Sequence, residues 1–292
     1  SDVYKRQFIN NEVDIVNNSF GYTGVITEYT EEQLRSNFSK TIKEISQINV
    51  LDQDKTLFVW SAGNYNGIVN TDGEKVEASD PGILAGLSYF FPELAKNNVA
   101  VVAVNKDGDI AEFSNRCGVA SEFCIAAPGV RVPLAIPNNL FNSLTDIEKE
   151  GFNENFLDYL ESHPTEAYLL GSGTSFSAPH VTGAIAVLKE LFKDNLSSIQ
   201  ILDRIFKTAN KKGKYSNKEI FGQGFLDLKT ASSPVGSALF YTTSDINGSA
   251  SLAASTYILA SKSFGDSLIV GLKNKSISIF DAYDLSLIHI WR

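Results

Sequence analysis

The sequence GSGTSFSAPHV, residues 171–181, places a serine where its neighbours could make it a nucleophile. Ser175 follows Gly171 and Gly173, which have no Cβ and would let a substrate backbone come close. Apolar residues recur at helical spacing after it, which predicts that Ser175 lies at the start of a helix. The free N–H groups and the positive dipole end of a helix N-terminus stabilise a developing anion. Pro179 fits this position because the first turn of a helix has no hydrogen bond for proline to remove. The sequence therefore predicts a reactive serine at the start of a helix.

The run GTSFSAPHV closely resembles the serine motif of the subtilisin-like serine proteases, the subtilases. The resemblance implies that Ser175 attacks a peptide carbonyl, and that Gly173 and Thr174 lie beside the substrate. An esterase of the α/β-hydrolase class is an alternative, but its G-x-S-x-G elbow would need glycine where this chain has Ser177. The family implies a serine endopeptidase with an α/β fold, in which helices flank a mostly parallel sheet in three layers.

The segment FVWSAGNYNG, residues 58–67, has the pattern of an apolar strand that ends in a turn of small and polar residues. It resembles the oxyanion segment of the subtilases, with Asn64 as the side-chain donor to the oxyanion. The same resemblance makes Ser61, Ala62 and Gly63 the walls of the primary specificity pocket. A carboxamide is uncharged and does not titrate, which suits a preorganised donor. Without the resemblance, this segment would be interpreted as a polar turn.

The segment VDIVNNSFG, residues 13–21, is predicted to be a strand that ends near Gly21. It resembles the substrate-binding strand of the family. Ser19, Phe20 and Gly21 would then pair with an extended peptide through main-chain hydrogen bonds. An ordinary strand end followed by a glycine turn is the alternative.

A serine nucleophile needs a base, and subtilases place the aspartate and histidine of their triad before the substrate-binding strand. The histidines of this chain are His163, His180 and His289, and all of them follow Ser19. His180 belongs to the helix of the serine, so we expect a packing residue there and not the base. The chain also contains no Met. We therefore expect a piece of a longer protein whose upstream part supplies the aspartate and the histidine; a subtilase-like passenger that only binds or adheres is the alternative.

The apolar patterns predict the elements that position these motifs. Strands are expected at 13–17, 56–60, 99–104 and 123–126, and helices at 31–45, after a capping box that begins at Thr30, and at 197–209. A strand, a helix and a strand in this order form a parallel βαβ unit, so Ser19 and Ser61 should lie at neighbouring strand ends that open into one crevice. The segments 68–98 and 137–166 are expected to be polar, irregular insertions. Their acidic residues could bind calcium, although solvated surface is the default.

The domain boundaries follow from the same resemblance together with a change in composition: FGQGFLDLKTA, residues 221–231, resembles the end of a subtilase catalytic domain, and the chain after Pro234 is rich in Ser, Ala and Gly. We expect a catalytic domain over 8–233 and a β-rich linker over 234–284, which resembles the segment before the translocating barrel of autotransporter proteases. Residues 1–7 and 285–292 resemble translated adapter sequence and are left out of the fold prediction. The net charge of −9 argues against nucleic acid as a partner and leaves polypeptide substrates, with an outer-membrane barrel as a further partner of the whole protein.

Cys117 and Cys124 lie within NRCGVASEFCIAAPG. Their spacing matches neither a zinc site nor a C-x-x-C redox motif, so a local disulfide and two separate buried thiols are the interpretations that remain. The disulfide is favoured, and it would indicate export to an oxidising compartment. The segment also resembles one found in autotransporter-type subtilases, which pass through the periplasm to the bacterial surface.

Overall fold

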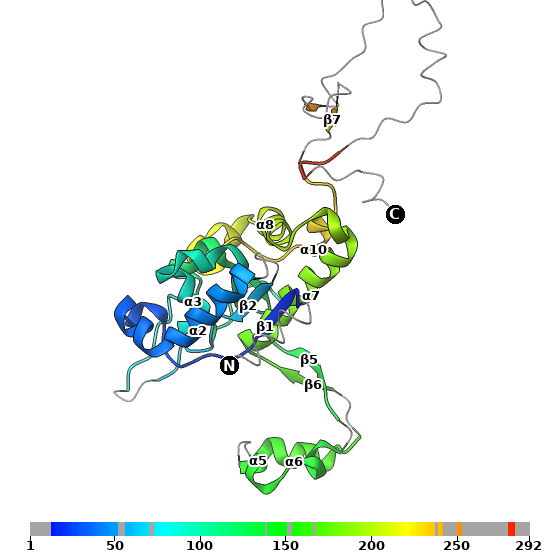
Figure 1. Ribbon diagram of the computed structural model, residues 1–292. Helices are drawn as coiled ribbons and strands as arrows, with labels where there is room; N and C mark the ends of the chain where they lie inside the picture. The colour runs from blue at the N-terminus through cyan, green and yellow to red at the C-terminus, as the bar shows by residue number, and fades with distance from the viewer. Residues whose placement is uncertain are drawn as a thin grey trace, which may run out of the picture.

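A sheet of four parallel strands forms the centre of the protein. The computed structural model describes residues 13–51, 56–69, 73–137, 139–150, 154–165, 168–236, 239–241, 250–252 and 280–283. The strands are β1 (Ile15–Asn18), β2 (Leu57–Ser61), β3 (Asn98–Val104) and β4 (Cys124–Pro128), in the order β1-β2-β3-β4. Figure 1 labels β1 and β2 at the centre of the molecule. Strands β2 and β3 are buried along their whole length, as is usual for a parallel sheet that is covered on both faces.

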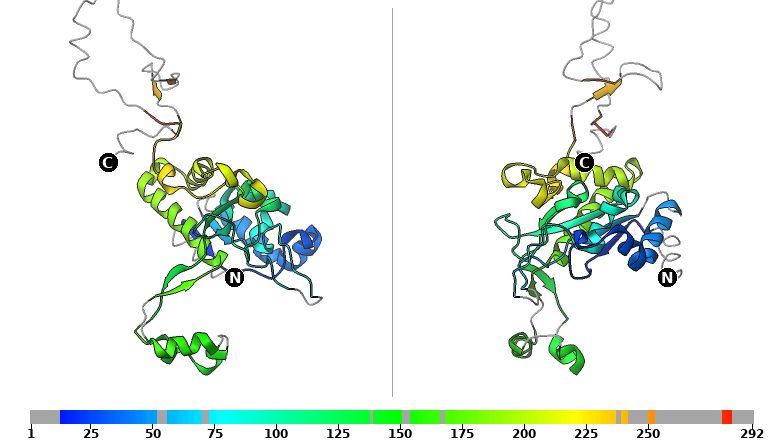
Figure 2. Two further views of the ribbon diagram at one scale, coloured as in Figure 1. Left: turned by 180° about the vertical axis from the view of Figure 1, so that it is seen from behind. Right: turned by 90° about the vertical axis from the view of Figure 1, so that its left-hand side faces the viewer.

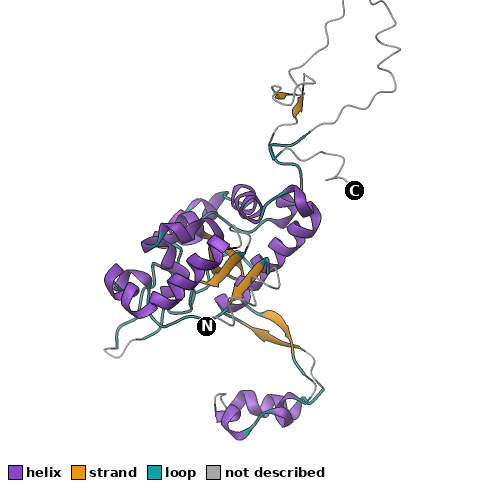
Figure 3. Ribbon diagram, in the orientation of Figure 1, coloured by secondary structure: helices purple, strands orange, loops and turns teal. Residues whose placement is uncertain are grey.

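Helices cover both faces of the sheet, and alternate strand residues divide the core in two. Phe58 and Trp60 of β2 pack with the face covered by α2 (Glu31–Leu51) and α3 (Ile83–Phe90). Leu57 and Val59 pack on the opposite face with α7 (Thr174–Phe192) and α8 (Ser198–Thr208). Figure 3 shows this order of helix, strand and helix. The three-layer α/β fold predicted from the sequence is confirmed.

Local signals in the sequence account for the helix boundaries. Thr30 forms the predicted capping box before α2, since its Oγ1 accepts from the Gln33 N–H and its N–H donates to Gln33 Oε1. The same reciprocal pair joins Ser197 and Gln200 at the start of α8. Each predicted strand lies within two residues of an observed one. Helix α2 carries a kink at Phe38, where the backbone leaves helical geometry.

The prediction of an irregular loop over 68–98 is wrong for its second half. Helix α3 and the 3-10 helix η2 (Pro92–Asn97) occupy it, and Ile83, Leu84 and Leu87 are buried in the core. The apolar run ILAGL carries this helix, and the polar residues before it obscured the pattern in the sequence.

The segment 137–166 is also not irregular. A hairpin of β5 (Val132–Ala135) and β6 (Tyr168–Gly171) projects from the body and bears α4 (Leu140–Ser143), α5 (Asp146–Glu150) and α6 (Glu154–Ser162) at its far end (Figure 2). Leu160 of α6 is buried, so these helices have a small core of their own. They are short, which makes their periodicity weak in the sequence.

The chain after α8 covers the outer edge of β4. Its elements are η5 (Gly213–Ser216), α9 (Lys218–Phe221) and α10 (Leu228–Ala231). Between the last two, the Ala126 N–H donates to the Gly224 carbonyl and the Leu226 N–H donates to the Ala126 carbonyl. No strand pairs with the outer edge of β1 among the described residues. In the described part of the chain, the sheet is thus covered at the edge of β4 only.

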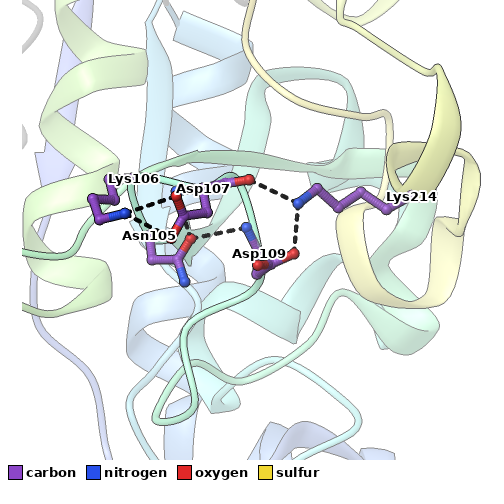
Figure 4. Close-up of polar contacts among 5 residues, drawn as sticks. All are labelled: Asn105, Lys106, Asp107, Asp109 and Lys214. Atoms are coloured by element: carbon purple, nitrogen blue, oxygen red, sulfur yellow. Dashed lines mark hydrogen bonds and ion pairs between the residues drawn. The ribbon is translucent and has the colours of Figure 1, made fainter.

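A polar cluster joins η5 to the turn after β3 (Figure 4). Asn105 Oδ1 accepts from the N–H groups of Asp107 and Asp109, which shapes the turn. Lys214 Nζ donates to the Asp107 carbonyl at 2.8 Å and to Asp109 Oδ1 at 2.5 Å. These contacts raise the pKa of Lys214, mainly through the bond to Asp109. The pair is exposed, so it adds little to stability.

The remaining described elements are short. They are the 3-10 helices η1 (Ile26–Glu28), η3 (Gly118–Phe123) and η4 (Lys193–Asn195), and the two-stranded β7 (Leu239–Tyr241) with β8 (Ala250–Leu252). Most of the expected β-rich linker over 234–284 lies outside the described residues, apart from these strands and 280–283. No helix in the described part of the chain is long and apolar enough to cross a membrane.

Candidate active site

The structure brings Ser175 to the end of β1. Ser175 lies in the first turn of α7, and its Oγ donates to the Ser19 carbonyl at 3.2 Å. Ser19 Oγ in turn donates to the Ser175 carbonyl at 2.8 Å. This reciprocal pair joins residues that are 156 positions apart in the chain. The structure thus brings the candidate nucleophile against the residue that follows β1.

Asn64 lies beside the same helix end, held by Thr174. Its Oδ1 accepts from the Thr174 N–H at 2.8 Å and from Thr174 Oγ1 at 2.9 Å. Two donors on one oxygen fix the amide plane and leave the Nδ2 group as the free donor of this exposed side chain. Nδ2 lies on the side of Gly173, only 3.2 Å from where a Cβ on that residue would be. A larger residue at position 173 would therefore crowd the amide.

A cavity of about 230 Å³ adjoins these groups. Ser61, Gly63, Asn64, Thr174 and Ser175 line one part of it, and Phe20 and Gly21 line another. The rest of the lining residues were not predicted: Tyr22, Thr23, Gly24, Tyr65, Ile68, Gly82, Leu84, Ala85 and Asn115. None of these residues is charged. The cleft is therefore an uncharged, partly apolar pocket that opens next to the Ser175 hydroxyl.

Asn115 braces the pocket wall, a role that the sequence analysis missed. Its Oδ1 accepts from the Tyr65 N–H at 2.7 Å, and its Nδ2 donates to the Asp80 carbonyl at 3.1 Å. Gly63 has φ of +111° beside it, and a Cβ there would be 2.9 Å from Asn115 Nδ2. Glycine is thus required at position 63 by both backbone and space. In the sequence, Asn115 is only a polar residue beside Arg116, and such a pair is equally typical of a surface turn.

Two predicted site residues have other roles. Ala62 is fully buried in the core and does not line the cavity, although its carbonyl accepts from the Gly82 N–H. At Gly171, a Cβ would collide with Leu134 and Phe176. Close packing at the base of the hairpin therefore gives a structural reason for this glycine.

No imidazole faces Ser175 in the described part of the chain. His180 is exposed and its Nδ1 donates to the Phe176 carbonyl within α7. It does not face Ser175 as a base would, and the prediction that it is a packing residue is wrong because its side chain lies at the surface. His163 lies on the hairpin tip, stacked on Tyr159. His289 lies outside the described residues. Near the pocket, burial lowers the pKa of Arg116.

The described residues contain no group of three or more His, Cys, Asp or Glu side chains placed to hold a metal ion. The acidic residues that could bind calcium therefore form no such cluster in this part of the chain. The cysteines behave as favoured: Cys117 and Cys124 form a disulfide that encloses η3 at the start of β4. Both cysteines are fully buried. Gly222 lies against them, and only glycine fits there because a Cβ would collide with the Cys124 carbonyl.

The fold and this arrangement define a subtilisin-like peptidase domain, and comparison with known sequences agrees. Residues 2–224 match the subtilase family, Peptidase S8, and the chain belongs to it. The chain is similar to Serotype-specific antigen 1 of Mannheimia haemolytica, with 30% identity over 232 residues, 77% of this chain and 21% of that protein. It is 30% identical to the Extracellular serine protease of Serratia marcescens over 190 residues, 65% of this chain and 16% of that protein.

Two further similarities extend the comparison. The Neisserial autotransporter lipoprotein NalP of Neisseria meningitidis serogroup B is 24% identical over 83% of this chain and 22% of its own length. Among solved structures, the self-cleaved protease domain of PatA aligns with a TM-score of 0.51 and 19% identity, over 78% of this chain and 63% of that one. That structural similarity shows the fold alone. The chain spans only 21% and 16% of the two relatives at 30% identity.

Proposed function

We propose that this chain is the part of a serine endopeptidase that carries the nucleophile and the oxyanion site. Ser175 Oγ would attack the peptide carbonyl, and the resulting oxyanion would accept from Asn64 Nδ2 and from the Ser175 N–H. The observation that carries the proposal is the double anchoring of Asn64 Oδ1 by Thr174, the residue before Ser175. This anchoring turns the Nδ2 donor toward the helix end at which the anion would form.

The base is proposed to be a histidine that this chain does not include, oriented by an aspartate. It would take the Ser175 proton during attack and give it to the leaving amine, after which water would hydrolyse the acyl-enzyme by the reverse roles. In the structure, the Ser175 hydroxyl donates to the Ser19 carbonyl instead. A serine paired in this way keeps its proton and is a weak nucleophile near neutral pH.

The pocket supports a preference for uncharged, apolar side chains on the acyl side of the cleaved bond. Its walls include Leu84, Ala85 and Ile68, and no described lining residue is charged. A Lys or Glu side chain entering it would lose water without gaining a partner, which is costly. Phe20 and Gly21 at its rim are exposed, and nothing lies within 4 Å of a Cβ on Gly21. An extended peptide could therefore approach this main chain.

The location is proposed to be outside the cytoplasm, on the cell surface or secreted. The buried Cys117–Cys124 disulfide supports an oxidising compartment. The names of two relatives, an extracellular protease and an autotransporter lipoprotein, support the same route. An outer-membrane barrel is then the proposed partner of the whole protein during export.

The test compares residues 8–284 with a version that carries upstream aspartate and histidine motifs. Both would be assayed on casein and on tetrapeptide substrates that differ only at the residue before the cut: Phe, Leu, Lys or Glu. We expect turnover by the longer version only, favouring Phe and Leu, and its loss in Ser175→Ala. Equal turnover of Lys or Glu substrates would refute the pocket assignment. A longer version that folds but never turns over would favour the binding passenger.

A further inference from the structure

A buried arginine lies at the end of α7 opposite Ser175. Arg204 of α8 is fully buried, and its guanidinium packs against the Phe192 ring at 4.6 Å from the ring centroid. Nε donates to the Ala231 carbonyl at 2.7 Å and Nη2 donates to the Ser233 carbonyl at 2.5 Å. Neutral carbonyls satisfy these donors but do not neutralise the charge. A buried cation of this kind requires an anion at contact distance.

The anion comes from the C-terminal part of the chain, 77 positions away. Arg204 Nη1 donates to Asp281 Oδ2 at 3.1 Å, and the two side chains are 0% and 1% exposed. Asp281 Oδ2 also accepts from the Val235 N–H at 3.2 Å, and Oδ1 accepts from the Tyr283 N–H at 2.8 Å. Both carboxylate oxygens are thus bonded, as a buried carboxylate requires.

The neighbours of Asp281 add contacts on the same surface. The Ala282 N–H donates to the Val235 carbonyl at 2.9 Å, a backbone bond between the two segments. The Tyr283 ring lies 5.0 Å from the Arg204 guanidinium, and its hydroxyl donates to Asp203 Oδ2 at 2.8 Å. This surface, formed by α8 and by Val235 after α10, therefore recognises a carboxylate, a main-chain N–H and a phenol from three successive residues.

We propose that the surface around Arg204, formed by α8 and Val235, is a docking site for the segment Asp281–Tyr283, and that it holds this segment on the catalytic domain independently of the intervening chain. The domain then includes 280–283 as well as the residues up to 233. A cut between 253 and 279 would leave two pieces that stay together. The inference goes beyond the proposed peptidase activity and does not depend on it. The docking site also lies far from the candidate nucleophile. Arg204 follows Ser175 by about 29 residues and packs against Phe192 at the opposite end of α7, and the length of this helix puts roughly 26 Å between Ser175 and Phe192.

The test uses residues 1–292 with a recognition sequence for a site-specific protease inserted after Gly265. The chain is cut, and the C-terminal piece is followed by gel filtration without denaturant. We expect it to co-elute with the domain. Asp281→Asn removes the charge at nearly constant shape. In this variant we expect the dissociation constant of the cut piece from the domain to rise about 10²-fold, so that the piece is retained less. The matched control is Asp109→Asn, which breaks the exposed ion pair with Lys214 and should leave retention unchanged.

A second variant covers the case in which Asp281→Asn does not fold. Tyr283→Ala keeps the buried ion pair but removes the ring and the bond to Asp203, so the uncut chain should stay folded by circular dichroism and the cut piece should dissociate about tenfold faster. The proposal is overturned if the wild-type piece separates after the cut. It is also overturned if folded Asp281→Asn or Tyr283→Ala retains the piece as the wild type does.

Discussion

Replacing Thr174 with valine tests how the candidate oxyanion donor is held. Valine keeps the shape of threonine but removes the hydroxyl, which donates to Asn64 Oδ1 at 2.9 Å and accepts from the Gly63 N–H at 3.1 Å. The Thr174 N–H bond to Asn64 Oδ1, at 2.8 Å, remains. Asn64 should therefore keep one of its two anchors and sample orientations in which Nδ2 no longer faces the oxyanion.

The expected magnitude follows from these two bonds. Each contributes about 0.5–1.5 kcal/mol net, so the free energy of unfolding should fall by about 1–3 kcal/mol. Loss of one anchor of the donor should raise the activation barrier by about 1.4 kcal/mol, which is a tenfold lower kcat. KM should change little, because the donor acts mainly in the transition state.

The assay is peptide hydrolysis by a version of the protein that carries the complete triad, with Thr174→Ser as the matched control. Serine restores the hydroxyl and should keep kcat within about twofold of the wild type. The reasoning is refuted if Thr174→Val leaves kcat unchanged. It is equally refuted if both variants lose activity to the same extent, since the hydroxyl would then not be the cause.

Three further predictions concern other parts of the structure. Asn64→Ala should lower kcat by about 10²–10³, the magnitude known for one oxyanion donor in subtilisin, with little change in KM; an unchanged kcat would remove Asn64 from the mechanism. Replacing Cys117 and Cys124 with alanine should lower the free energy of unfolding by about 2–3 kcal/mol, and mass spectrometry of non-reduced peptides should show the two linked, whereas alkylatable thiols would contradict the assignment. Burial, followed by the bond to Asp203, raises the pKa of Tyr283 above its usual value of about 10. Above pH 10 the unfolded chain should lose this proton first, so denaturant titrations should show a steeper loss of stability in the wild type than in Tyr283→Phe; equal slopes would count against the buried phenol.

Much of the fold could be predicted because its signals are local. The buried strands β2 and β3 are continuous apolar runs, and the capping box at Thr30 marks the start of α2 within the sequence itself. The serine motif was also local, since the glycines before Ser175 and the proline after it stand in one stretch. Neighbouring parallel strands then placed Ser19 and Ser61 at one edge of the sheet.

The rest depended on contacts that no local pattern records. Leu84 and Ala85 line the pocket because α3 lies beside the strand ends, and this helix was hidden by polar residues before it. Asn115 reaches Tyr65 across 50 positions, and Asp281 reaches Arg204 across 77. An arginine in an amphipathic helix is normally solvated, so its burial could not be inferred without its partner.

The most direct test of the central claim is to map where a fluorophosphonate reacts. A version carrying the upstream aspartate and histidine motifs would be treated with the reagent, digested, and analysed by peptide mass spectrometry. We predict a single phosphonyl adduct on Ser175, lost in Ser175→Ala and much slower in Asn64→Ala, because the tetrahedral adduct uses the same oxyanion donor. Labelling of another residue, or no labelling of a folded protein, would contradict the assignment of Ser175 as the nucleophile.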